Sequence, residues 1–290
     1  MSDTEDAKRH GAGAGQAPRL LALALVAPAL AAILFLYAYP LARSLVGAFA
    51  DEAGGVTLAH VETALVLYGR DVAFSIGVAA ASLALVAIAS IAIAGYLTLG
   101  ATPWAVAALR FLYRWPLFIP FVVAGQTARS FLGRNGLLNS GLVEIGLIDA
   151  ASAQSLLDWR GLVLAFAWKQ IPFVALLLAG AMASLDRAQV EAARNCGASR
   201  LRCLVEIVLP QVGPTLAVGL ILSLVTIFSV LSVPMMLIAG NPTMMTAMMA
   251  HRVTYFGDYA VANALGLVSY LVTSVAAVVY LRTVLAERTR

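Results

Sequence analysis

The sequence predicts an all-α membrane protein with six transmembrane helices. Hydrophobic residues make up 61% of its 290 residues, charged residues make up 12%, and the mean hydropathy is +0.90. Six apolar stretches approach or exceed the roughly 20 residues that an α-helix needs to cross the hydrocarbon core. Soluble domains of this length do not contain so many long apolar stretches, and we therefore expect a bundle of membrane-spanning helices.

Polar segments of uneven length separate the six stretches. A Gly/Ala-rich polar tail at residues 1–19 precedes the first stretch, and we expect this tail to be disordered and cytoplasmic. The expected spans are residues 20–39, 72–99, 115–131, 161–185, 214–238 and 261–281. Together they define one transmembrane domain over residues 20–285, with a methionine-rich interfacial helix expected within residues 243–260.

The first span has one alternative, a cleavable signal peptide. Ala29, Leu30 and Ala31 imitate the small residues that precede a cleavage site. The apolar stretch nevertheless continues to Tyr39, which is longer than the core of a signal peptide. We therefore expect a retained membrane span.

The distribution of basic residues predicts the orientation of the chain. With six spans, both termini lie on the same side as the segments at 100–114 and 186–213. These four segments hold twelve of the 19 Lys and Arg residues, whereas the opposite segments hold five. Because basic residues are enriched in cytoplasmic loops, we expect both termini to be cytoplasmic in the inner or plasma membrane. The arginines are scattered rather than gathered in a stripe with aromatic residues, so we do not expect nucleic-acid binding.

The segment at 186–213 is the longest polar interruption in the second half of the chain. Residues 190–196 and 199–209 each have the composition of a short helix, and Gly197 lies between them, where it allows a sharp turn. Apolar residues recur every three or four positions in the second piece, which gives it one apolar and one charged face. Pro210 is expected to mark the end of this piece. The pattern predicts a charged pair of short helices between the fourth and fifth spans.

The same segment resembles the cytoplasmic loop of the permease subunits of binding-protein-dependent ABC importers. Glu-Ala-Ala is followed after three residues by Gly, and after nine more by Ile-x-Leu-Pro. The matching residues are Glu191, Ala192, Ala193, Gly197, Ile207, Leu209 and Pro210. The resemblance implies the type I permease fold, with a coupling helix that docks on an ATP-hydrolysing subunit. An amphipathic helix lying on the lipid surface is the alternative, but it does not explain this spacing.

The resemblance also implies partners. They are two ATP-binding subunits, a second permease (a sister chain or a second copy), an extracytoplasmic solute-binding protein and the surrounding bilayer. The chain has no phosphate-binding loop of the GxxxxGK[ST] type and no hydrolase motif. We therefore expect a non-catalytic subunit that needs no cofactor, with ATP bound by its partner.

Within the loop, Glu191 is the first candidate for a polar contact with the ATPase, because a carboxylate can accept two hydrogen bonds from one arginine. Its alternative role is to stabilise the N-terminal part of a helix. Ala192 and Ala193 are small enough for a partner to approach closely, although alanine also simply favours helix formation. Arg194, with two arginines that follow Gly197, can face a lipid headgroup or a protein partner equally well. Leu209 and Pro210 complete the coupling set.

Polar residues inside the expected spans are the candidates for a solute path, because polar groups in lipid are costly and tend to face a cavity or another helix. The candidates are Gln126, Arg129, Lys169, Ser223, Thr226, Ser229 and Asn263. Lys169 can instead be paired or reach toward the membrane surface. The residues spaced by three from Ser223 to Ser229 can equally serve close helix packing.

A metal site is not expected. Cys196 and Cys203 match no zinc spacing. A cluster of six methionines between Met235 and Met249 leaves a soft-metal site open, but adaptable packing is the favoured interpretation.

The substrate signals conflict. The IPFVALLLAG stretch at 171–180 resembles carbohydrate permeases, whereas GRNGLLN at 133–139 and LSVPMML at 231–237 resemble polyamine permeases. The polyamine type is slightly favoured for a small polar organic solute, with a carbohydrate as the alternative. An ATP-independent secondary transporter is the rival class. It would need carboxylates inside the spans for ion coupling, and the span interiors lack them.

Overall fold

The computed structural model describes residues 17–51, 55–238 and 240–288, and helices account for nearly all of the regular structure in this part. Most of the tail predicted to be disordered, residues 1–16, lies outside the described residues. Five helical segments of the described part are long and apolar enough to cross a membrane. A sixth is obtained when one sharply bent pair is taken as a single span, which agrees with the predicted all-α membrane fold.

The spans are longer than expected at several ends. The first comprises α2 (Ala17–Ile33), the π-helical turn η1 (Leu34–Ala38) and α3 (Tyr39–Phe49), so it continues ten residues beyond its predicted end. The second, α4 (Ala59–Leu99), has 41 residues and begins well before the predicted residue 72. The others are α8 (Trp159–Ala183), the fifth span that ends with α11 (Leu209–Ser229), and α14 (Tyr259–Arg288).

The third span, expected over residues 115–131, is broken into two halves in the structure. Helix α5 (Pro103–Leu112) and the 3₁₀ turn η2 (Trp115–Phe118) lead to α6 (Phe121–Leu132) and α7 (Leu137–Glu144). The two halves meet at an angle of 108°. Pro120 disfavours helical geometry in the residue before it, and Ile119 is extended with ψ 122°.

Proline acts differently in the fifth span, where the predicted boundary at Pro210 is absent. Helix α10 (Arg200–Cys203), the π-helical turn η4 (Leu204–Val208) and α11 form one continuous helix of 30 residues. The Leu209 N–H bonds to the Leu204 oxygen, five residues back. The first span has the same arrangement, with η1 ending two residues before Pro40. Since proline lacks an N–H and crowds the preceding turn, a wider turn accommodates it without ending the helix.

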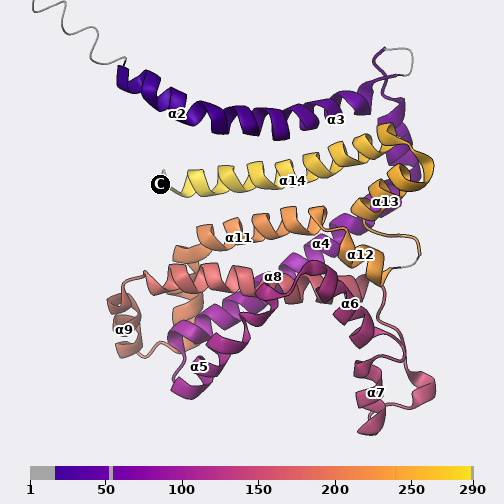
Figure 1. Cartoon of the computed structure of the whole chain (residues 1–290). Helices are drawn as coiled ribbons and strands as arrows, with labels where there is room; N and C mark the ends of the chain where they lie inside the picture. The colour runs from indigo at the N-terminus through magenta and orange to yellow at the C-terminus, as the bar shows by residue number, and fades with distance from the viewer. Residues whose placement is uncertain (1–16, 52–54, 239, 289–290) are drawn as a thin grey trace, which may run out of the picture.

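Figure 1 shows how the helices are arranged. Helix α8 packs along α4 at the centre, and the buried core is formed mainly by these two helices with α11 and α14. The first span lies at the edge of the bundle beside α14, and its apolar residues are largely exposed. Helix α9 (Arg187–Asn195) and the last turns of α14 lie at one end of the bundle. Helix α7, α12 (Ser232–Leu237) and α13 (Met245–His251) lie at the other.

Candidate functional site

The predicted pair of short helices is present between α8 and the fifth span. Asp186 begins α9, and its carboxylate accepts a hydrogen bond from the Ala188 N–H at 2.9 Å. Gly197 then turns the chain with φ +87°, a left-handed conformation that favours glycine. The Ala198 N–H donates to the Ala193 oxygen at 3.0 Å across this turn. Ser199 begins α10 by accepting from the Arg202 N–H at 3.2 Å.

Helix α9 presents the residues of the Glu-Ala-Ala motif outward. Glu191, Ala192 and Arg194 are exposed, Ala193 is half-buried, and no residue of α9 is buried. The side chain of Glu191 is therefore accessible to a partner. Leu209 and Pro210 lie in the helix that follows, half-buried and exposed respectively. The roles of these residues in coupling stay predictions.

A residue outside the predicted set connects α9 to the fifth span. The Gln211 Nε2 donates to the Gln189 Oε1 at 3.0 Å and to the Ile207 oxygen at 2.8 Å. Gln211 follows Pro210 directly, so a polar side chain just beyond the Leu-Pro pair was the available signal. Arg202 and Glu206 also form an exposed ion pair at 2.9 Å on the fifth span. Such an exposed i, i+4 pair contributes little to stability, because water screens the two charges.

Lys169 is bonded within the fold. It is buried on α8, and its Nζ donates to the Pro116 oxygen at 2.5 Å and to the Ile119 oxygen at 2.6 Å. The ring of Phe121 lies 4.9 Å from the same atom. The ammonium group thus binds two backbone carbonyls at the break in the third span, and the Pro116 oxygen also accepts from the Ile119 N–H at 3.3 Å. These contacts account for a charged residue in a span without invoking a solute.

Gln126 is the solute-path candidate that lines an open cleft. This cleft has a volume of about 490 Å³ and lies between α6 and Met236 of α12. A second cleft of about 410 Å³ lies between α6 and α8, and both are lined by Thr127 and Phe131. Ser130, like Thr127, was missed by the sequence reasoning, although both are polar residues within the predicted third span. Nearby, Arg129 donates to the Met236 oxygen at 3.3 Å.

The remaining candidates are not gathered at these clefts. Thr226 and Ser229 of α11 donate to carbonyl oxygens of their own helix at 2.8 and 2.7 Å. Ser223 is fully buried, and its Oγ has no hydrogen-bond partner among the described residues. Asn263 accepts from Ser44 at 2.7 Å between α3 and α14, beside Gly47. The structure therefore divides the seven candidates among four regions: the cleft beside α6, the break in the third span, helix α11 and the contact between α3 and α14.

A buried polar network that the sequence reasoning did not identify anchors the methionine-rich segment. Asp71 accepts from the Thr243 N–H at 2.8 Å, and Ser75 accepts from the Met245 N–H at 2.9 Å. Asp71 was missed because the second span was expected to begin one residue later. Met244 and Met245 are 1% exposed and belong to the core of the chain itself.

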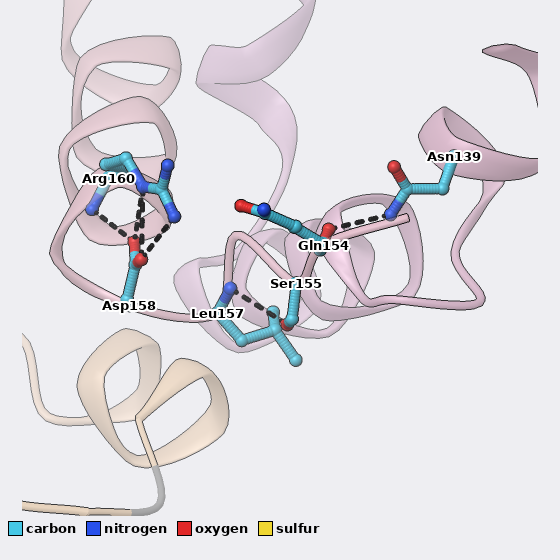
Figure 2. A network of polar contacts seen from close by, with 6 residues as sticks. All are labelled: Asn139, Gln154, Ser155, Leu157, Asp158 and Arg160. Atoms are coloured by element: carbon cyan, nitrogen blue, oxygen red, sulfur yellow. Dashed lines mark hydrogen bonds and ion pairs between the residues drawn. The ribbon is translucent and has the colours of Figure 1, made fainter. Parts of the chain in front are cut away.

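Hydrogen bonds also hold the connection from α6 to α8 (Figure 2). Asn139 of α7 donates to the Gln154 oxygen at 2.8 Å, and to the carbonyl oxygens of Gly133 and Arg134. Asp158 caps α8 and pairs with Arg160 at 2.8 Å. The hydrogen bond from the Arg160 side chain holds the pKa of the Asp158 carboxyl below its usual value. Asn139, the last residue of the GRNGLLN stretch, therefore has a structural role.

The family model described as "Binding-protein-dependent transport system inner membrane component" matches residues 19–290, nearly the whole chain. The chain belongs to this family. It is an ABC importer permease, a non-catalytic subunit that crosses the membrane several times. Family membership thus confirms the resemblance inferred from the Glu-Ala-Ala loop, and it argues against an ATP-independent secondary transporter.

Among its relatives is the sulfoquinovosyl glycerol transport system permease protein SmoG of Agrobacterium fabrum, 26% identical over 285 residues. The alignment covers 92% of this chain and 91% of SmoG. The spermidine/putrescine transport system permease protein PotB of Escherichia coli is 27% identical over 114 residues, covering 39% of this chain and 41% of PotB. A crystal structure of a bacterial ABC transporter involved in alginate import matches with a TM-score of 0.75 at 21% identity. The superposition covers 97% of this chain and 99% of the matched chain of the alginate transporter, which establishes the type I permease fold.

Proposed function

We propose that this permease forms half of a translocation pathway with a second permease, driven by two ATP-binding subunits and supplied by an extracytoplasmic solute-binding protein. In this proposal α9, both termini and the α5 end of the bundle face the cytoplasm. The main support is the exposed α9 joined through Gly197 to an unbroken membrane-spanning helix. A docking helix connected in this way suits the transmission of force from a partner to a span.

The connection between α9 and the fifth span supports a mechanism. Because α10, η4 and α11 form one helix of 30 residues, a displacement of α9 crosses only the turn at Gly197 before it reaches the span. The Gln189–Gln211 bond adds a second connection between the same two elements. ATP binding would bring the ATP-binding subunits together, move the two α9 helices and shift the permease pair between inward-open and outward-open packings.

For the solute, we propose a small polyhydroxylated molecule of the carbohydrate class. SmoG, which is aligned over 91% of its length, is named for a sugar-containing solute, whereas the alignment with PotB covers 39% of this chain. The clefts beside α6 are lined by the amide of Gln126 and the hydroxyls of Thr127 and Ser130, and by no carboxylate. A polycation would need carboxylates there to offset its loss of hydration.

A polyamine is the second candidate, which the sequence patterns slightly favoured. The relationship to PotB supports it, and the alignment spans 114 residues. The carboxylates that it requires would then come from the partner permease or the binding protein. In that case α6 would contribute shape and hydroxyl groups but no charge.

The test is reconstitution of the permease with its partner permease, ATP-binding subunits and binding protein in liposomes. Hydrolysis of ATP and solute uptake are measured with neutral and anionic glycosides and with spermidine. We expect glycosides to stimulate both processes, and Gln126→Leu to reduce glycoside uptake about tenfold, the effect of losing about 1.4 kcal/mol of hydrogen bonding. Stimulation by spermidine alone would overturn the solute class. Uptake without any ATP-binding subunit would overturn the function itself.

A further inference from the structure

A cleft of about 410 Å³ opens beside α9, at the end of the bundle where α4 and α8 end. Its walls come from the last residues of α4, from the turn between α8 and α9, and from α10 with η4. Arg187, Arg194 and Arg200 line it together with the carboxylates Asp186 and Glu191. The cleft is thus built from segments that the chain brings together from several elements.

The three arginines of this cleft differ from the three arginines that form ion pairs in the described part of the chain. Arg160, Arg202 and Arg252 are each paired with a carboxylate at 3.3 Å or less. Within the described part of the chain, no carboxylate lies within ion-pair distance of Arg187, Arg194 or Arg200. The Asp186 carboxylate accepts a hydrogen bond from the Ala188 N–H, and the N-terminus of α9 therefore offsets part of its negative charge. The cleft therefore carries an excess of positive charge.

The inner wall of the same cleft is apolar. Leu99 is the last residue of α4, Met182 lies next to the end of α8, and Val208 ends η4. Met182 and Val208 are 3% and 1% exposed. Because Leu99 and Met182 lie at the ends of membrane-spanning helices, we place the mouth of the cleft near the depth where lipid headgroups meet the hydrocarbon core. It offers guanidinium groups on its outer side and an apolar surface on its inner side.

We propose that this cleft binds the headgroup phosphate of an anionic phospholipid, with the glycerol backbone against its apolar wall. Guanidinium groups bind phosphate oxygens in a planar, two-bonded arrangement. A lipid reaches the cleft laterally from the leaflet, and its chains remain in the bilayer. Since Glu191 lines the same cleft, a lipid bound there lies beside the residue proposed to contact the ATP-binding subunit.

Lipid binding is tested on the full-length permease by native mass spectrometry, with equal amounts of phosphatidylglycerol and phosphatidylcholine. We expect phosphatidylglycerol to be retained preferentially, and Arg200→Gln to reduce that preference about fivefold, the equivalent of about 1 kcal/mol per basic residue. Arg202→Gln is the matched control. It removes the same charge two residues away, but Arg202 is paired with Glu206 and lines a different cleft.

Four results would overturn the proposal. Equal retention of the two lipids would show that the cleft has no preference for an anion. Equal losses in Arg200→Gln and Arg202→Gln would indicate a general surface charge effect. Displacement of phosphatidylglycerol by inorganic phosphate at an equal concentration would indicate an anion site rather than a lipid site. If Arg200→Gln left lipid retention unchanged but weakened binding of the ATP-binding subunits, the cleft would be a protein interface. The melting temperature of each variant verifies that the fold is intact.

Discussion

Gly197 is the residue on which the shape of the α9–α10 turn depends. Its φ of +87° lies in the left-handed region, where a Cβ atom is strained even though open space surrounds it. The Gly-containing motif therefore reflects a backbone requirement as well as any contact with a partner. The short helices on either side are local structures with their own caps at Asp186 and Ser199.

Replacing Gly197 with alanine is expected to disturb the turn at a cost of about 1–2 kcal/mol. Because the spans do not depend on this turn, the variant should still insert into the membrane, with α9 displaced relative to α11. Solute taken up per ATP hydrolysed should then fall. Gly213→Ala is the matched control, since Gly213 lies outside the left-handed region and an added Cβ there would meet no atom within 4 Å. Wild-type coupling in Gly197→Ala would contradict this account of the loop.

Among the elements, the third span departs most from a simple bundle. Its prolines divide it into halves at 108°, and Lys169 of α8 fixes the point of division. On the α7 side, Gly136 is packed so closely that a Cβ would lie 2.6 Å from the Phe131 oxygen. Hydrogen bonds from Lys169 thus hold the bend, and close packing at Gly136 holds the turn between α6 and α7.

Lys169→Met should destabilise this break, because it removes the charged donor from the Pro116 and Ile119 oxygens, and among the described residues only the Pro116 oxygen keeps a backbone donor, the Ile119 N–H. A carbonyl left unsatisfied costs about 1–3 kcal/mol, so the thermal unfolding temperature of the purified permease in detergent should fall. Lys169→Arg keeps the donors and should recover part of the loss. A Lys169→Met variant as stable as the wild type would show that the ammonium group contributes nothing to the break.

Local patterns made part of this structure predictable. The helices around Gly197 could be inferred because their signals lie within about 20 consecutive residues. The bonds of Asp71 and Lys169 could not, since their partners lie 172 and 53 or 50 residues away along the chain. The break at Pro120 was missed because hydropathy continues through it unchanged. Whether Gln126 and its neighbours contact solute depends on a second permease, which this sequence does not contain.

At the scale of the whole molecule, α9 lies at the same end of the bundle as the start of α2 and the last turns of α14 (Figure 1). The excess of basic residues in these segments predicts that this end faces the cytoplasm. The two cysteines allow a direct test without adding a probe site. Cys196 is exposed near the end of α9, and Cys203 is fully buried.

A membrane-impermeant maleimide should therefore label Cys196 in inside-out vesicles and leave it unlabelled in right-side-out vesicles. Cys196→Ser should abolish the labelling, because Cys203 is not accessible. The reaction is followed by the mass shift of the purified chain. Labelling from the outside would reverse the proposed orientation and place α9 away from any cytoplasmic ATPase.

The length of α4 has a consequence for the height of the permease. At about 1.5 Å per residue, its 41 residues extend about 60 Å, twice the thickness of about 30 Å of the hydrocarbon core. The first turns of α4, which carry Glu62 and Arg70, therefore extend into the aqueous phase unless the helix is strongly tilted. A helical extension of this kind offers a water-soluble partner a contact surface outside the bilayer.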